Sequence, residues 1–557
     1  MAISAAPSAP TEADPLLRSR SHDGVDRDFS SRRSASENED CGSEEMGHVR
    51  KDLGNRTYVL LPSVAIGLLL AAMDQLITLA AYAKIGNDLN AMNSMTSSAM
   101  LTVDDVYSYF LTLTSCQPLY GKLSDIFGRK VCLLFAYAIF GIGCLGCGLS
   151  QSLLQLCIAR GIAGIGGGGI TALVSILISV TVPLRDRGIW QGYIDMIFAT
   201  GTLAGAPLGG ILADSIGWRW SFIGQAPMCL LAGLALHFLL PMPPSSPSSR
   251  HELLSKMKSI DFSGALTLVS SILALLLGLD SGSNVGWTQP QTLIPLAITP
   301  LLVAAFIYNE VHVASYPFAP GHIIFNPSMF ACYMANFFGV ASQMGAFFFL
   351  PLFFQAVQGF SAALSGTLLM QGMAFGVLSS IGSGWVIKKT GKFYWINVSA
   401  FGLAFLSTPL LALGFWRKSV VLQVLAFIAS SIGVYAVLIA LLANTTMADT
   451  AVTVACSYMF RSLGASVGVS TSSALLQYVL RTELGHRLSH DKGLVDEIGQ
   501  RVRQNIDYIK ELPPIVAAIV RSSYQHASVI ALAPPVLCGL LAFIFTFWVR
   551  EAALRNK

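Results

Sequence analysis

The sequence predicts an all-helical protein that crosses a membrane many times. Of its 557 residues, 53% are hydrophobic and only 12% are charged, whereas soluble domains carry roughly 25% charged residues. From residue 58 onward, apolar stretches alternate with short polar breaks, and each stretch is long enough to cross a hydrocarbon core of roughly 30 Å as a helix. This composition excludes a soluble enzyme. The net charge of only +4 provides no basic face for a nucleic acid.

Each apolar stretch is predicted to form one transmembrane helix. The second stretch is the least clear of them, because the residues before it are polar. The fourteen stretches lie approximately at 58–83, 102–120, 131–149, 153–181, 189–213, 219–240, 261–279, 291–310, 328–354, 362–387, 395–415, 419–443, 450–478 and 526–549.

These stretches divide the chain into two six-helix halves with an insertion between them. Before the first half, a tail rich in Ser, Asp, Glu and Arg has the composition of a disordered segment. The predicted parts are a cytosolic tail (1–56), the first half (57–240), a cytosolic linker (241–260), an inserted helix pair (261–310), the second half (328–549) with a long luminal or extracellular loop (479–525), and a cytosolic end (550–557).

Lys and Arg residues set the expected orientation, because positively charged loops stay in the cytosol. They gather after the second, fourth, sixth and tenth stretches, which places both termini in the cytosol. Arg417 and Lys418, which follow the eleventh stretch, conflict with this pattern.

A repeat relates the two halves. The segment GKLSDIFGRK (121–130) has a weaker counterpart in GWVIKKTGK (384–392), in which Lys388 replaces Asp125. Internal repeats around a central site are common in transporters that open alternately to the two sides. The matched residues, at one common offset, are Gly121 with Gly384, Gly128 with Gly391, and Arg129 with Lys392.

The first of these segments carries a specific motif. Its glycines, Gly121 and Gly128, allow a tight turn and close helix approach, while Asp125 can pair with Arg129 or Lys130. In this pattern, G-x-L-x-D-x-x-G-R-K, the chain resembles the major facilitator superfamily, where it follows the second helix. The resemblance implies a secondary transporter in which this charge cluster holds one conformation.

A second motif resembles the fourteen-helix drug:proton antiporters of that superfamily. It is GTLAGAPLGG in the fifth stretch and comprises Gly201, Gly205, Pro207, Gly209 and Gly210. Three of its glycines recur every four residues, so they line one helix face, and the proline permits bending. The resemblance implies that this helix moves during exchange.

Few charged residues lie inside the apolar stretches, where charge is costly and usually functional. Asp74, in the first stretch, resembles the acidic residue of the family's first-helix motif, and a buried carboxylate can gain and lose a proton. We expect Asp74 to carry the coupled proton and Arg160, before a glycine run, to tune or compete with it. Asp195, one turn after Gln191, is either a structural residue or a cavity group that favours cations. Arg461 stands beside small residues in the second half.

The N-terminal tail contains a candidate sorting signal. In EADPLL, Glu12 stands four positions before the pair Leu16 and Leu17, which matches the acidic dileucine signals that adaptor proteins read on the way to endosomal or vacuolar membranes. A chance match in a polar tail is the alternative.

Together these features predict a proton-driven antiporter that moves a small organic solute out of the cytosol, with no catalysis, metal or cofactor. The chain looks most similar to fungal vacuolar basic amino acid transporters and their multidrug relatives. The solute is therefore either a basic amino acid moved into the vacuole or a drug, toxin or metabolite expelled across the plasma membrane. Nucleotide hydrolysis is unsupported, because no G-x-x-x-x-G-K-[ST] occurs. A membrane sensor or enzyme without transport is the alternative from another class.

Overall fold

The computed structural model is helical in the part of the chain that it describes, which confirms the predicted fold class. It describes residues 62–552 with gaps, the longest at 79–97 (Ile85 and Asp88 apart), 240–260, 314–320, 433–436 and 488–511 (Ile509 apart). The sorting signal of Glu12, Leu16 and Leu17, the predicted linker and the last five residues lie outside the described residues.

Every predicted stretch contains a helix. Among the described residues, eleven helical segments are long and apolar enough to cross a membrane, and Val64–Thr78 and α15 are shorter apolar helices. In chain order the helices are Val64–Thr78, α2 (Ser98–Phe127), α3 (Arg129–Leu149), α4 (Leu153–Thr181), α5 (Arg187–Ser215), α6 (Trp218–Ile223), α7 (Gln225–Leu239), α9 (Phe262–Asn284), α10 (Pro290–His312), α11 (Gly321–Ile324), α12 (Pro327–Ala356), α13 (Ala362–Thr390), α14 (Tyr394–Trp416), α15 (Val420–Ser431), α16 (Val437–Ala443), α17 (Thr450–Arg487), α19 (Pro514–Ala531) and α20 (Ala533–Thr546).

Two segments predicted as loops are partly helical. α2 runs through Pro118 and continues to Phe127, and it ends before Gly128, whose φ of +88° favours glycine. In the predicted long loop 479–525, α17 continues to Arg487 and α19 begins at Pro514, so helix reaches into both ends of that range. A proline at the first helical position starts α19 without losing a hydrogen bond.

The N-terminal half packs around the glycine run of α4. A Cβ added at Gly164 would lie 2.3 Å from the carbonyl oxygen of Tyr109 in α2, and one at Gly166 would lie 2.4 Å from the amide nitrogen of Phe140 in α3. α4 therefore approaches two helices at backbone distance, which only glycine permits. This packing explains the glycine-rich sequence after Arg160.

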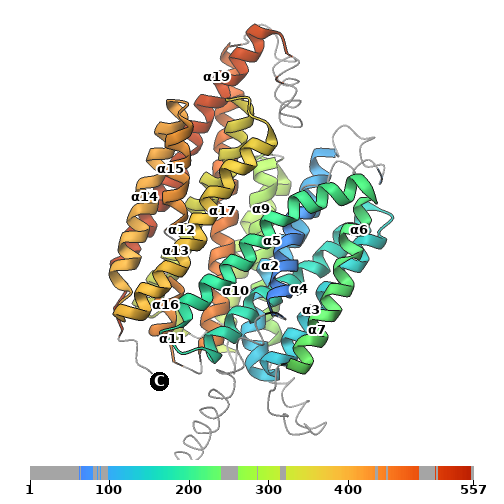
Figure 1. Cartoon of the computed structure of the whole chain (residues 1–557), viewed down its shortest axis with the longest axis vertical. Helices are drawn as coiled ribbons and strands as arrows, with labels where there is room; N and C mark the ends of the chain where they lie inside the picture. The colour runs from blue at the N-terminus through green and yellow to red at the C-terminus, as the bar shows by residue number, and fades with distance from the viewer. Residues whose placement is uncertain are drawn as a thin grey trace, which may run out of the picture. The chain divides into compact units, whose positions relative to one another are not determined.

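The remaining helices form a second group, with the inserted pair beside both. α12 packs against α17 and α20, and α14 against α15. Figure 1 shows α12 to α15 on one side and α3, α4, α6 and α7 on the other. The inserted helices α9 and α10 pack on each other, and α9 also contacts α2 and α17.

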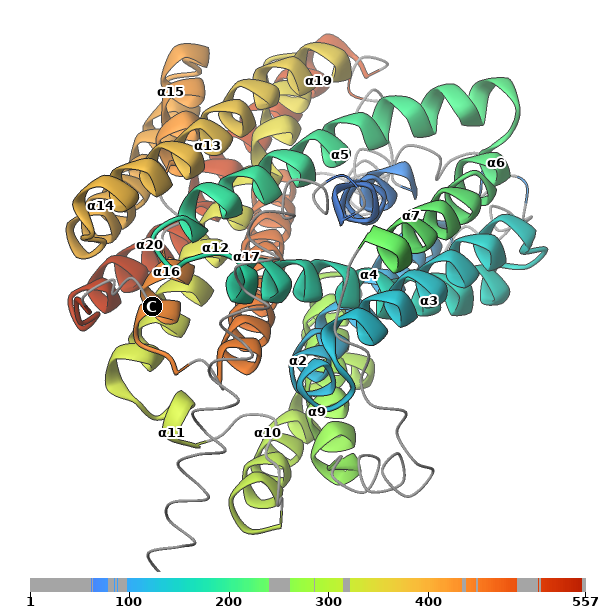
Figure 2. The same ribbon diagram turned by 60° about the horizontal axis from the view of Figure 1, so that its bottom comes forward.

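Two close helix crossings join the halves, and α4 also contacts α17. α5 of the first half runs beside α13 of the second (Figure 2), and α2 packs against α17. At one crossing, a Cβ added at Gly384 would lie 2.4 Å from the carbonyl carbon of Gly188, and at the other, a Cβ added at Gly121 would lie 2.6 Å from the Cβ of Ala455. Gly121 and Gly384 are equivalent in the repeat, so the repeat has a structural counterpart at these crossings.

Candidate functional site

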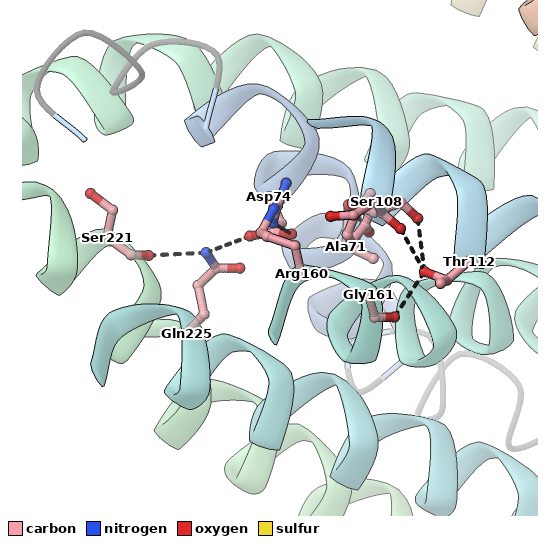
Figure 3. Close-up of polar contacts among 9 residues, drawn as sticks. Ala71, Asp74, Ser108, Thr112, Arg160, Gly161, Ser221 and Gln225 are labelled. Atoms are coloured by element: carbon pink, nitrogen blue, oxygen red, sulfur yellow. Dashed lines mark hydrogen bonds and ion pairs between the residues drawn. The ribbon is translucent and has the colours of Figure 1, made fainter. Parts of the chain in front are cut away.

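A buried ion pair lies inside the N-terminal half. Arg160 Nη1 of α4 donates to Asp74 Oδ2 at 2.5 Å, and the two side chains are 1% and 0% exposed. Figure 3 shows the pair between the helix Val64–Thr78 and α4. The structure thus brings together the two residues that the sequence predicted to act together.

Neighbouring groups support both charges of this pair. Gln225 Nε2 of α7 donates to Asp74 Oδ1 at 3.2 Å and to the Ser221 carbonyl at 3.0 Å (Figure 3). The Arg160 guanidinium lies over the rings of Tyr109 and Phe222, at 4.6 and 5.6 Å from their centroids. Cation–π contacts of this kind stabilise a guanidinium that water cannot reach.

A second polar cluster lies where the two halves meet. Ser380 Oγ of α13 donates to Asp195 Oδ2 of α5 at 2.8 Å, and Gln191 Nε2 donates to Asp195 Oδ1 at 3.3 Å. Gln191 Nε2 also lies 3.4 Å from the Tyr458 hydroxyl oxygen of α17, and Gln191 Oε1 accepts from Ser175 Oγ of α4 at 3.2 Å. Four helices therefore meet at Gln191 and Asp195.

A positive charge adjoins this second cluster. Arg461 stands three residues after Tyr458 on α17, so the two side chains lie on the same face of that helix. Asp195 belongs to the first half of the chain and Arg461 to the second, so opposite charges face the junction from both halves. The predicted site residues accordingly occupy two places: Asp74 and Arg160 lie within one half, and Asp195 and Gln191 lie at the junction.

The antiporter-type glycine motif connects α5 to the helix of Asp74. A Cβ added at Gly201 would lie 2.6 Å from the Leu69 carbonyl oxygen, and one at Gly205 would lie 2.4 Å from that of Met73. α5 therefore packs on the backbone beside Asp74. The rest of the motif contributes less to this contact: Gly209 is buried, Pro207 is exposed, and a Cβ at Gly210 would meet nothing within 4 Å.

The superfamily-type motif forms the junction between α2 and α3. Asp125 Oδ1 and Arg129 Nη2 lie 3.6 Å apart, and Lys130 Nζ donates to the His237 carbonyl of α7 at 2.7 Å. Partial burial raises the pKa of the Asp125 carboxyl, the Asp449 carboxylate acts in the same direction, and Arg129 and Lys122 oppose them.

The two crossings carry similar kinds of contact on successive turns, but their charges differ. The first turn is polar in both, with Ser462 Oγ donating to Gln117 Oε1 at 3.0 Å in one and Ser380 bound to Asp195 in the other. The second turn holds the close contacts of Gly121 and Gly384. On the third turn, Lys388 Nζ forms a 2.9 Å ion pair with Asp186 Oδ1, whereas its repeat equivalent Asp125 faces the like charge of Asp449.

Comparison with known proteins fits this architecture. A sequence profile of the Major Facilitator Superfamily matches residues 64–469. The chain belongs to the major facilitator superfamily.

Curated superfamily relatives are of two kinds. The vacuolar membrane amino acid uptake transporter fnx2 of Schizosaccharomyces pombe is 35% identical over 82% of this chain and 77% of its own. The vacuolar basic amino acid transporter 2 of Saccharomyces cerevisiae is 30% identical over 78% of this chain and 95% of its own. The multidrug resistance protein fnx1 of S. pombe is 32% identical over 90% of this chain and 94% of its own.

Solved superfamily structures share the fold. The match to the proton:xylose symporter XylE covers 90% of this chain and 97% of the XylE chain, with a TM-score of 0.56 and 17% sequence identity. The match to the human organic anion transporter TETRAN covers 88% of this chain and 99% of the TETRAN chain, with a TM-score of 0.55 and 14% sequence identity. The chain is therefore an integral membrane transporter of the superfamily, and a small solute is its substrate class.

Sequence reasoning missed several residues of both clusters. Gln225 stands in the segment GWRWSFIGQAP, where neither spacing nor charge marks it. Tyr458 could have been identified from the sequence. It occupies the position equivalent to Asp195 in the other half, at the same offset of 263 residues that relates Gly121 to Gly384. Extending the superfamily repeat from the loops into the helices would have found it.

Proposed function

We propose that this chain is a proton-driven antiporter that moves basic amino acids from the cytosol into the vacuole. The buried Asp74–Arg160 pair is the observation that carries the proposal, because an intramembrane carboxylate paired with an arginine is a common site of proton exchange. Two relatives named as vacuolar amino acid transporters support the substrate class. Efflux of drugs or metabolites is the second candidate, favoured by the similarity to fnx1.

The coupling step follows from the contacts of Asp74. A proton on Asp74 cancels the carboxylate charge and leaves Arg160 with its aromatic neighbours, so protonation and the packing of Val64–Thr78 on α4 are linked. Because Gly205 packs on the Met73 carbonyl, the change is passed to α5. α5 carries Asp195 at the junction of the halves. The energy comes from the proton gradient, and no bound cofactor takes part.

Transport by the purified full chain in liposomes tests the proton coupling. With an imposed pH gradient, the wild type should accumulate labelled lysine above its external concentration. Asp74→Asn should still exchange lysine but should lose accumulation, because the variant has no proton to carry. Asp88→Asn is the matched control, since Asp88 also pairs with an arginine, Arg219 at 3.0 Å, but is 52% exposed.

Two results would contradict this coupling step. Uphill transport by Asp74→Asn with an unchanged dependence on pH would exclude Asp74 as the proton carrier. Equal loss of accumulation in Asp88→Asn would show that the assay responds to any lost carboxylate in this half.

The proposed vacuolar location depends on the tail. A fluorescent fusion should label the vacuolar rim, and the double substitution Leu16→Ala and Leu17→Ala should move the signal to the plasma membrane, because an adaptor would no longer read the tail. Leu53→Ala, a tail leucine outside the motif, should have no effect. Plasma-membrane signal in the unmodified protein would favour the efflux candidate.

A further inference from the structure

We propose that the cluster at the junction of the halves binds the α-amino acid group of the substrate, with Asp195 receiving its ammonium and Arg461 its carboxylate. This assignment rests on the proposed function, since it concerns the substrate of that antiporter. Ser175, Gln191, Ser380 and Tyr458 complete the cluster with neutral hydrogen-bonding groups.

The first argument is position. The cluster draws on α4 and α5 of the first half and on α13 and α17 of the second. Transporters with internal repeats bind their substrates near the middle of the membrane, between the repeats. Asp74 and Arg160, by contrast, lie wholly within one half and bind each other, so they offer no pair of opposite charges shared between the halves.

The second argument is charge balance. Asp195 of the first half and Arg461 of the second carry opposite charges, and Arg461 stands three residues after Tyr458, whose hydroxyl contacts Gln191 of the same cluster. When the halves part in the transport cycle, the two charges move away from each other, and separating opposite charges within a membrane protein is costly. A zwitterion with its ammonium on Asp195 and its carboxylate on Arg461 keeps both charges balanced throughout that movement.

The third argument is the chemistry of the neutral groups. The Asp195 carboxylate accepts from Ser380 Oγ and Gln191 Nε2, which are uncharged donors that an ammonium can displace or join. The Arg461 guanidinium presents several N–H donors in a fixed fork that matches a carboxylate. An amine without a carboxylate satisfies only one side of this arrangement, so the cluster favours amino acids over simple cationic drugs.

Exchange transport with substrate analogues tests the assignment. Liposomes containing the full chain are preloaded with lysine, and uptake of labelled lysine is competed with unlabelled lysine, with lysine methyl ester, which lacks the carboxylate charge, and with 6-aminohexanoate, which lacks the α-ammonium. This exchange needs no proton gradient, so it does not depend on Asp74.

The wild type should prefer lysine over either analogue by roughly 10- to 100-fold, the usual effect of one hydrogen-bonded charge. Arg461→Gln should abolish the preference over the methyl ester and keep that over 6-aminohexanoate, and Asp195→Asn should do the reverse. Arg461→Lys should retain part of the carboxylate preference. Ser462→Ala is the matched control, because Ser462 neighbours Arg461 and also donates across the halves, to Gln117, but carries no charge.

The outcomes separate this inference from the proposed function. The inference is overturned if the wild type exchanges lysine but does not distinguish it from the analogues. It is also overturned if both charge variants weaken the binding of lysine and of both analogues equally. In either case amino acid transport stands. If the wild type exchanges a cationic drug and no amino acid, the proposed substrate class fails as well. If Arg461→Gln or Asp195→Asn does not fold, the inference is tested by the wild-type preference for lysine over the two analogues and by the Arg461→Lys variant.

Discussion

Asp74 and Arg160 are almost fully buried, so protein groups must supply what water would supply elsewhere. Removing water from an ion costs several kcal/mol, and mutual attraction repays this only when the remaining polar atoms also find partners. Here Gln225 donates a hydrogen bond to the Asp74 carboxylate, and two aromatic rings form cation–π contacts with the Arg160 guanidinium. Apolar residues in place of a buried ion pair often leave stability unchanged or raise it. The presence of the pair therefore favours a role in function.

Loss of one partner should therefore damage the protein more than loss of both charges. Arg160→Ala leaves the Asp74 carboxylate buried without its cation, and we expect it to lower the free energy of unfolding by about 3–5 kcal/mol. The double variant Asp74→Asn with Arg160→Gln buries no charge and should unfold at a higher temperature than Arg160→Ala. Thermal unfolding in detergent measures both. Equal unfolding temperatures would mean that Asp74 does not depend on Arg160 for compensation.

The sequence identified the charged residues of the sites because charge inside an apolar stretch is rare. It did not identify their neutral partners, because serine, glutamine and tyrosine are common in such helices and their contacts join distant segments. Ser380 lies 185 residues from Asp195, and Gln225 lies 151 residues from Asp74. Such contacts depend on which helices cross, and apolar spacing alone does not determine that.

Among the elements, the crossing of α5 and α13 depends on the smallest side chains. Gly188 and Gly384 bring the two backbones into direct contact. Gly382 lies two residues away on α13, yet a Cβ there would meet nothing within 4 Å. Gly382 and Gly384 lie in the same helix but in different surroundings, so substitution of Gly382 is a matched control for substitution of Gly384.

Gly384→Ala should destabilise the protein, because the added methyl group overlaps the Gly188 backbone and overpacking costs about 1–3 kcal/mol. Gly382→Ala should be neutral or should stabilise by about 0.5–1 kcal/mol, because alanine favours a helix more than glycine. The unfolding temperatures of the two variants measure the difference. A Gly384→Ala protein as stable as Gly382→Ala would place α5 and α13 farther apart than in this structure.

At the scale of the whole molecule, apolar length predicted the eleven long apolar helices among the described residues, because a helix needs a fixed length to cross the bilayer. The exact ends were less predictable: α2 and α17 continue as helices into polar sequence, where bilayer thickness no longer limits them. The repeat predicted that the halves are alike. It did not predict that one crossing ends in the ion pair Lys388–Asp186 and the other in the like charges of Asp125 and Asp449.

In the proposed transport cycle both crossings would have to part for the halves to separate, since each joins the same two halves. Fixing one crossing should therefore stop transport even if the other is untouched. We expect this of the variant with Asp186→Cys and Lys388→Cys, whose positions are partly exposed and in contact across α5 and α13. A bifunctional thiol reagent with the span of an extended lysine side chain should abolish lysine exchange, and reduction of a cleavable reagent should restore it.

The variants with Asp186→Cys alone or Lys388→Cys alone, treated in the same way, are the controls, because each has only one of the two introduced thiols and cannot be joined between these two positions. Reagent-treated single variants should exchange lysine at the rate of their untreated forms. Undiminished exchange in the cross-linked double variant would mean that α5 and α13 stay together throughout the cycle. Movement would then have to occur within a half, and the equivalent turns of the two crossings would serve only to stabilise the fold.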